Sequence, residues 1–545
     1  MKNKLFFISL VAMCLSIAAC SNQGNGPDQS SKEDVSSEEQ YNIVRPEFTP
    51  DYNTFGVSAV PSGVNMSYYT DIYSRGFSWL TDKDTEPTEL YLVQSDKGEQ
   101  ADFSAAELIE GKSLLVTCAK DGTVSAEGLT AKKGSSNAQE EIVMSHKVHV
   151  ENLEKGKAYS YKIGSEAGYV YGAFVVEKAS AKSITAVHMS DAQTKDLSKS
   201  NVWRNTFVKS VQTAGADLDM ALYNGDQFDQ NNSTGNNKEP MRLFRYSNAL
   251  DIIYDYKFNI PYMSSSGNHE PSSAYGHYLM SGEINYAGFD YTGCYYSYDY
   301  DYAHFVVLNT NEVNNDQINW LKDDLEAAKD AKWKVVMMHI SPYSTGDHSN
   351  KSENQNIVQK LTPIFSEKHV DLVLQAHDHT YNKTLPYKWD AAGYTETWNN
   401  AEVVNLEPET EQVGEREYDK NPEGTYYVTT GAAGHRCGAA ESDGRWAEVV
   451  KDGDSWKGLD SSNTFLSNKY KIELGKIKYA NQYESYTVSG FTSAQNYQVG
   501  DLATGNVNAQ MFGVLNLTET TMTYDVYTVN NDTVKLFDSV DVLKA

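Results

Sequence analysis

From about residue 181 onward, short apolar runs alternate with helical patterns, and this alternation constrains the fold more than any other feature. The pattern predicts strands at 184–188, 219–223, 305–308, 334–338 and 371–374, and helices at 202–214, 242–256, 316–328 and 355–368. Two more strand-like segments, 508–517 and 522–529, would return to finish a second sheet, and 441–500 could be an insertion. Strands that alternate with helices predict a layered α/β domain over 181–545, with its ligand site at the carboxyl ends of the strands.

Residues with metal-binding side chains follow these predicted strands. In chain order they are Asp191, Gln193, Asp226, Asp229, Asn268, His269, Glu270, His339, His377 and His379. Any one of them alone is more often a turn or core residue. Five such segments in one order indicate a shared site, and carboxylates, an amide oxygen and imidazoles suit Mn, Fe or Zn better than Ca or Mg. Histidines elsewhere are taken as structural, namely His146, His149, His188, His277, His304 and His369.

The five segments resemble the blocks of the calcineurin-like metallophosphoesterase superfamily, and the chain is similar to its purple acid phosphatase branch. Residues 370–379 and 424–434 are especially similar to the later blocks of that branch. The resemblance covers roughly 45–545. It implies a four-layer α/β/β/α catalytic domain, preceded over 45–178 by an all-β fibronectin III-like sandwich. Two features of 45–178 agree with such a sandwich. One is a set of alternating apolar runs at 65–69, 76–80 and 89–93, and the other is the segment from Leu153 to Tyr161, which looks like a tyrosine corner.

The resemblance also implies a role for each site residue. Asp226 would bridge two metal ions. The first ion would be bound by Asp191 and His379, with Gln193 as a weak contact, and the second by Asn268, His339 and His377. His269 would stabilise the phosphoryl group or protonate the leaving oxygen. His348, nine residues after His339, is similar to a substrate-side histidine, although a surface-loop histidine is an equal alternative.

This arrangement implies an enzyme that hydrolyses small phosphate esters by in-line attack of a metal-activated hydroxide, and both monoester and diester hydrolysis fit it. Two departures from purple acid phosphatases affect the metals. Asp229 replaces the Tyr that binds ferric iron and gives the colour, and Gln193 replaces a Gly. We therefore expect a colourless enzyme with two divalent ions, Mn, Zn or Fe(II). The alternative is an inert surface binding or adhesion lipoprotein that keeps the fold.

The amino terminus predicts export. Lys2 and Lys4 precede an apolar run that ends in Ile-Ala-Ala-Cys20, which resembles a lipoprotein signal peptide over 1–20 with lipidation at Cys20. A plain secretory signal is the alternative. Residues 21–44 are polar and predict a flexible tether. The protein would be an extracytoplasmic, membrane-anchored lipoprotein that meets the membrane through its lipid only. A formal net charge of −28 argues against nucleic-acid binding.

Overall fold

The computed structural model describes only part of the chain, and the structural statements below concern that part. The described residues are 41–47, 58–69, 71–118, 123–126, 129–132, 141–177, 182–194, 197–228, 249–270, 295–343, 352–379, 381–384, 386–389, 403–405, 408–435, 449–452, 455–458, 509–530 and 532–545. The predicted signal peptide and most of the predicted tether and insertion lie outside the described residues. So do three residues singled out above, Cys20, Asp229 and His348. Tyr41–Ala545 constitutes one compact unit. Among the described residues, we find no helix with the length and apolar character needed to span a bilayer.

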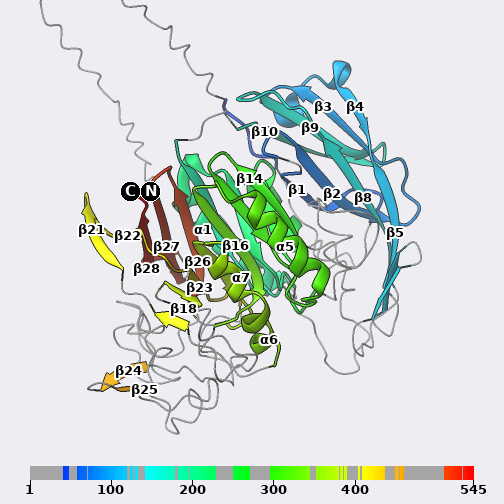
Figure 1. The fold of residues 1–545 in the computed structure, drawn as a ribbon. Helices are drawn as coiled ribbons and strands as arrows, with labels where there is room; N and C mark the ends of the chain where they lie inside the picture. Colours follow the sequence, from blue (N-terminus) through cyan, green and yellow to red (C-terminus); the bar gives the residue numbers. More distant parts are fainter. Residues whose placement is uncertain are drawn as a thin grey trace, which may run out of the picture. The chain divides into compact units, whose positions relative to one another are not determined.

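The α/β part contains an eight-stranded sheet (Figure 1). In spatial order its strands are β13 (Tyr262–Ser265), β12 (Met220–Asn224), β11 (Ile184–Met189), β26 (Gln510–Leu517), β27 (Thr521–Asn530), β28 (Thr533–Leu543), β22 (Arg416–Lys420) and β21 (Glu409–Val413). Strands β11, β12 and β13 are parallel, and β26 pairs antiparallel with β11. The carboxyl-terminal strands therefore return to this α/β part, as expected.

A second sheet of the α/β part has six strands. In spatial order they are β14 (Tyr296–Tyr300), β15 (Ala303–Val307), β16 (Trp333–Ile340), β17 (Leu372–Ala376), β23 (Tyr426–Thr430) and β18 (Tyr381–Lys383). Strands β15, β16, β17 and β23 run parallel. Two short hairpins accompany the sheets, β19 (Tyr387–Trp389) with β20 (Val403–Asn405) and β24 (Val449–Asp452) with β25 (Ser455–Gly458).

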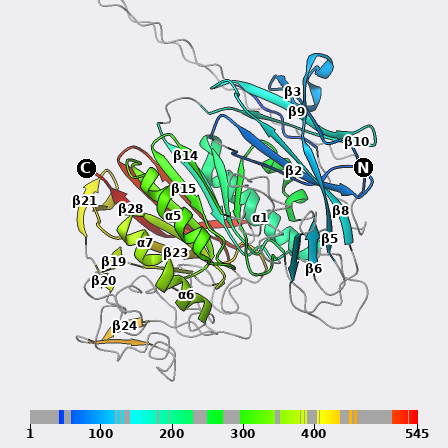
Figure 2. The same ribbon diagram turned by 45° about the vertical axis from the view of Figure 1, so that its right-hand side comes forward.

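The two sheets pack face to face because alternate residues of each strand point to opposite sides. In β11, Ala186 belongs to the core between the sheets, whereas Val187 belongs to the core under helix α1 (Leu197–Ala214). The second sheet is covered on its other face by α5 (Asn315–Ala327), α6 (Ser352–Lys360) and α7 (Thr362–Glu367), as Figure 2 shows. A further short helix, α3 (Tyr254–Lys257), precedes β13. The layers are therefore helix, sheet, sheet and helix, as expected.

Two predicted helices are wrong in their continuity. In the helix predicted over 242–256, residues 242–248 lie outside the described part, and a turn at 252–253 interrupts the rest before α3 begins at Tyr254. The segment 355–368 forms two helices, α6 and α7, which are separated at Leu361. Pro363 lies in the first turn of α7, where its missing N–H is tolerated, but a proline cannot continue the preceding helix. The chain therefore restarts a helix at this point, although the apolar periodicity runs through it.

The amino-terminal part consists of two antiparallel sheets. One contains β1 (Ser62–Ser67), β2 (Arg75–Asp82), β8 (Glu141–Val150), β5 (Lys112–Cys118), β6 (Thr123–Ala126) and β7 (Leu129–Lys132), and the other β10 (Gly168–Val175), β9 (Ala158–Ser165), β3 (Glu89–Gln94) and β4 (Glu107–Glu110). Phe77 and Trp79 from the first sheet share a core with Leu90 and Tyr161 from the second. At the start of β9, the Tyr159 hydroxyl accepts a hydrogen bond from the Glu154 N–H at 3.1 Å.

The same apolar core includes residues of the α/β part. Tyr254 and Phe258 lie in it, and the Tyr161 hydroxyl donates to the Phe258 carbonyl at 2.8 Å. Nearby, the buried Asp251 carboxylate accepts a hydrogen bond from the Gly63 N–H at 2.7 Å. The two parts are thus joined by apolar packing and by hydrogen bonds that satisfy buried polar groups.

Candidate metal centre

The turn after β12 brings Asp226 close to the turn after β13. Gly225 has φ +77°, and a Cβ on it would lie 2.5 Å from the Gly267 backbone nitrogen. Only glycine fits this position, because the two turns are nearly in backbone contact. Asp226 itself has φ +54°, a conformation that is strained for a residue with a side chain. The backbone therefore holds the Asp226 carboxylate against the segment that carries Asn268.

The buried Glu270 carboxylate fastens these two turns together. One of its oxygens accepts hydrogen bonds from the Asp226 N–H at 2.8 Å and the Gly267 N–H at 2.6 Å. The other oxygen accepts one from the Gln227 N–H at 2.6 Å. Glu270 was noticed in the sequence only as part of its segment, and no role was predicted for it. Its place suggests that it positions candidate ligands without being one.

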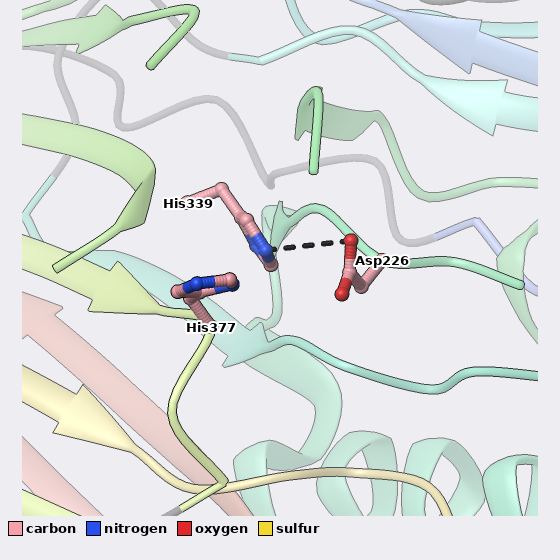
Figure 3. A group of neighbouring side chains, drawn as sticks. All are labelled: Asp226, His339 and His377. Carbon is pink, nitrogen blue, oxygen red and sulfur yellow. Dashed lines mark ion pairs between the residues drawn. The ribbon is translucent and has the colours of Figure 1, made fainter. Parts of the chain in front are cut away.

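Three buried side chains lie close together beside the Asp226 turn, and Figure 3 shows how they face one another. The metal-binding atoms of Asp226, His339 and His377 all lie within 4.8 Å of one another, and we call these residues the Asp226–His339–His377 group. His339 Nε2 lies 3.3 Å from Asp226 Oδ1 and 2.9 Å from Asn268 Oδ1. His269 lies at the edge of the group, with Nε2 3.7 Å from Asp226 Oδ2.

A hydrogen bond on the side of the ring away from Asp226 fixes the orientation of His339. Its Nδ1 lies 2.6 Å from the Asn224 carbonyl oxygen, and because a carbonyl only accepts, Nδ1 must carry the proton. Nε2 is therefore the nitrogen that faces Asp226, an arrangement common among metal-binding histidines. The Asn224 side chain in turn donates to the Met338 and Leu374 carbonyls at 3.2 and 2.7 Å, which ties β12 to β16 and β17.

The turn after β11 supplies a second group of candidate ligands. His379 Nε2 lies 3.4 Å from Asp191 Oδ1, and the His377 N–H donates to Asp191 Oδ2 at 3.3 Å. Gln193 donates from its amide nitrogen to Asp226 Oδ2 at 3.1 Å, so this group adjoins the first one. Asp191, Gln193 and His377 have φ of +53°, +43° and +74°. The strained backbone thus coincides with the candidate ligands.

Comparison with known families identifies this part of the chain. Residues 185–381 match the sequence model described as calcineurin-like phosphoesterase. They form a calcineurin-like phosphoesterase domain. All candidate ligands from Asp191 to His379 lie inside it.

Two acid phosphatase relatives match different shares of this chain. Acid phosphatase type 7 of Mus musculus is 26% identical over 314 residues, which are 53% of this chain and 64% of that protein. Purple acid phosphatase 21 of Arabidopsis thaliana is 29% identical over 143 residues, 23% of this chain and 32% of that protein. The chain thus spans less than two thirds of the length of these relatives.

One solved structure has a similar fold. The purple acid phosphatase isolated from yellow lupin (Lupinus luteus) seeds aligns with a TM-score of 0.53 at 14% identity. The alignment covers 89% of this chain and 74% of that one, so the likeness of fold includes more than the phosphoesterase domain.

Such phosphoesterases and their purple acid phosphatase relatives imply divalent metal ions, and the residues present fit them. Asp191 is fully buried, yet its Oδ1 accepts no hydrogen bond from any described residue. A buried carboxylate oxygen that accepts no hydrogen bond is costly unless a cation faces it, and His379 Nε2, 3.4 Å away, is placed to share such a cation with it. The surrounding donors are oxygens and imidazole nitrogens, which suit Mn, Fe or Zn.

The pKa shifts around the candidate metal centre also favour a negatively charged Asp226 carboxylate. Burial alone would raise the pKa of Asp226, but the imidazoles of His269 and His339 outweigh it and lower that pKa well below its usual range. Burial likewise favours a neutral His339, whereas the Asp226 carboxylate raises the pKa of His339. Burial, assisted by the Asp226 charge, raises the pKa of Glu270 to about 7. These shifts favour an ionised Asp226 carboxylate, whose charge in turn raises the pKa of both His339 and Glu270.

The predicted site residues mostly come together. The short distances given above connect eight of them, namely Asp191, Gln193, Asp226, Asn268, His269, His339, His377 and His379. His348 and Asp229 lie outside the described residues. Two residues with a positioning role were missed, Glu270 and Asn224. An acidic residue directly after the Gly-Asn-His segment could have indicated a role for Glu270. Nothing in the spacing indicated a role for Asn224.

Proposed function

We propose that this protein is a metal-dependent phosphoric ester hydrolase with a two-metal centre in its calcineurin-like phosphoesterase domain. The observation that carries the proposal is the convergence of five separate strand-end segments on Asp226 and Asp191. In the reaction, water adds to phosphorus, the bond from phosphorus to the alcohol oxygen breaks, and the alcohol leaves with a proton. Phosphomonoesters and phosphodiesters both fit this scheme.

The chain's own residues divide between two ion positions. Asp226 would face both ions, with Asp191 and His379 on one side and Asn268, His339 and His377 on the other. Gln193 presents its amide nitrogen to Asp226, so it orients that carboxylate in addition to any weak contact with an ion. Bound divalent ions would lower the pKa of water and neutralise the phosphoryl oxygens. The absence of Tyr at position 229 favours divalent Mn, Zn or Fe(II) over ferric iron.

His269 is the best placed residue for proton transfer. Its side chain is 17% exposed, whereas Asp226 and His339 beside it are buried, and its backbone N–H donates to Asp226 Oδ1 at 2.8 Å. The His269 imidazole is thus accessible to an incoming ester. It can hold a proton for the departing alcohol oxygen.

We further propose that the amino-terminal part is a fibronectin III-like sandwich. Its support is the order of strands in the two antiparallel sheets and the bond from the Glu154 N–H to the Tyr159 hydroxyl, which has the form of a tyrosine corner. We also propose that residues 1–20 direct export and that Cys20 carries a lipid. Loss of lipid-modified peptide on Cys20→Ser, detected by mass spectrometry, would test the anchor.

The function is tested with the full chain in mild detergent. Metal is removed, Mn, Zn or Fe(II) is returned separately, and hydrolysis of 4-nitrophenyl phosphate and of its bis-ester is measured. Turnover that depends on metal and is lost in Asp226→Ala supports the proposal, provided that Asp226→Ala keeps a cooperative thermal transition. Glu326→Gln, an exposed carboxylate on α5, is the matched control and should behave as wild type. A chain that binds no metal would contradict the proposal and favour the binding lipoprotein.

A further inference from the structure

A pocket of about 410 Å³ opens beside the Asp226–His339–His377 group. His377 and Asn268 belong both to this pocket and to the candidate metal centre. The remaining lining residues come from three places: Thr310, Asn311 and Val313 follow β15, Ile340 ends β16, and Glu353 and Asn356 lie on α6. An ester whose phosphoryl group occupied the metal centre would therefore place its alcohol part in this pocket.

The polar groups of the pocket come from opposite segments of the fold. Glu353 and Asn356 are three residues apart on α6, so they lie next to each other on one side of the helix. Glu353 Oε1 is 3.9 Å from His377 Nε2, which places this carboxylate directly beside the metal centre. On the opposite segment, Asn311 donates from its amide nitrogen to the Gly267 carbonyl at 2.8 Å, and this bond orients the Asn311 amide.

The chemistry of these groups favours hydroxyl-bearing ligands. Two amides offer both donors and acceptors, the Thr310 hydroxyl does the same, and the Glu353 carboxylate only accepts. Among the described lining residues there is no Lys or Arg. The Glu353 side chain is 45% exposed, and a second anionic group on the alcohol would face its like charge at the open side of the pocket, with no cation supplied by the described lining residues.

We propose that this pocket selects phosphate esters of uncharged polyhydroxy alcohols, such as sugars, over alcohols that carry a second phosphate. The proposal rests on the proposed phosphoesterase function. Glu353 is the specificity-determining residue: it accepts hydrogen bonds from hydroxyl groups of the alcohol and disfavours an additional negative charge. Asn311 and Asn356 complete the hydroxyl-binding wall on the two sides of the pocket.

The kinetic test compares glucose 6-phosphate with glucose 1,6-bisphosphate as substrates of the full metal-loaded chain. We expect kcat/KM to favour the monophosphate by about 3- to 5-fold, and Glu353→Gln to remove most of this preference, as expected for one like-charge contact at a half-exposed carboxylate. Glu326→Gln removes an exposed carboxylate outside the pocket and should leave the ratio unchanged. Equal kcat/KM for both sugars, or a ratio that Glu353→Gln does not alter, overturns the proposal.

A binding measurement separates this proposal from the proposed function. His269→Ala, loaded with the same metal, is titrated calorimetrically with both sugar phosphates under conditions of slow turnover. Tighter binding of the monophosphate, with a smaller difference in the His269→Ala/Glu353→Gln double variant, supports the pocket assignment. Equal binding or tighter binding of the bisphosphate overturns it, even in an active enzyme. Absence of 4-nitrophenyl phosphate hydrolysis with every metal would instead contradict the phosphoesterase function, and the titration would still decide the preference of the pocket.

Discussion

The Glu270 carboxylate accepts a hydrogen bond from the backbone N–H of Asp226 at 2.8 Å. The same carboxylate also accepts from Gly267 and Gln227, so it joins the turn that carries the proposed bridging ligand to the turn that carries Asn268. Substitution of groups that hold metal ligands from behind typically lowers metal affinity by about 10- to 100-fold. This bond leads to the first prediction.

Glu270→Gln should weaken metal binding by about 10- to 100-fold, because the new NH2 group would face backbone N–H donors in place of an acceptor oxygen. Metal affinity measured by competition with a chelator would show this, and the substituted protein should also unfold at lower temperature. The matched control, Glu326→Gln, changes an exposed glutamate in the same way and should keep wild-type affinity. Unchanged metal affinity in Glu270→Gln would show that the two turns hold together without this carboxylate.

His269→Ala should lower kcat by about 100-fold or more and leave the metal content nearly unchanged, because we assign His269 to proton transfer and not to metal binding. Metal content per chain, together with kcat and KM for 4-nitrophenyl phosphate, tests this division. The comparison variant is His339→Ala, which removes a proposed ligand and should lose metal as well as activity. If His269→Ala also loses its metal, His269 is a ligand and the proton must come from another group.

Gly434→Ala should disturb the metal centre from outside its ligand set. A Cβ at this position would lie 1.9 Å from the Ala192 carbonyl oxygen, between Asp191 and Gln193. The turn after β11 must shift to accept it, so we expect lower metal affinity and a loss of about 1–3 kcal/mol in the free energy of unfolding. Gly414→Ala is the control, because its Cβ would meet no neighbour and only the φ of +63° is unfavourable. It should cost about 1 kcal/mol and retain metal.

His304 should make stability depend on pH. Its burial would lower the pKa, but hydrogen bonds to Asp299 at 2.7 Å and Asp324 at 2.9 Å prevail and raise the pKa to about 9. Since the pKa is higher in the folded state than the roughly 6.5 of the unfolded chain, the stabilisation is complete below about pH 6.5 and disappears as pH rises through about 9.

We therefore expect His304→Gln to cost about 1–3 kcal/mol at roughly pH 6 and clearly less at roughly pH 10. Urea unfolding of wild type and variant at both pH values gives this difference, and other titrating groups cancel between the two proteins. A cost that stays the same at both pH values would mean that His304 contributes by packing alone.

The sequence predicted the strands well because buried parallel strands are short apolar runs whose ends are marked by polar residues. Strand β12 was expected at 219–223 and occupies Met220–Asn224, and β17 was expected at 371–374 and occupies Leu372–Ala376. The helix over 355–368 was predicted as continuous because Ile357, Leu361 and Ile364 keep the helical period across the break. There the effect of Pro363 on the backbone prevailed over the periodicity.

The candidate ligands could be found from sequence because each follows a predicted strand, and the carboxyl ends of parallel strands meet at one edge of a sheet. The supporting contacts could not. Asn224 acts through its backbone carbonyl and through bonds to two other strands, which depend on how the sheets face each other. The pocket residues Asn311 and Glu353 are brought together from a loop and a helix, and no spacing in the chain relates them.

The pairing of β26 with β11 has a consequence for the synthesis of the protein. β11, which leads to Asp191, is paired on one side with β12 and on the other with β26, where Ile184 lies opposite Leu517. The ribosome must therefore translate more than half of the chain after β11 before that edge can be closed. Until then that edge of β11 has no partner from the carboxyl-terminal strands, and such an unpaired strand edge makes a nascent chain prone to aggregation.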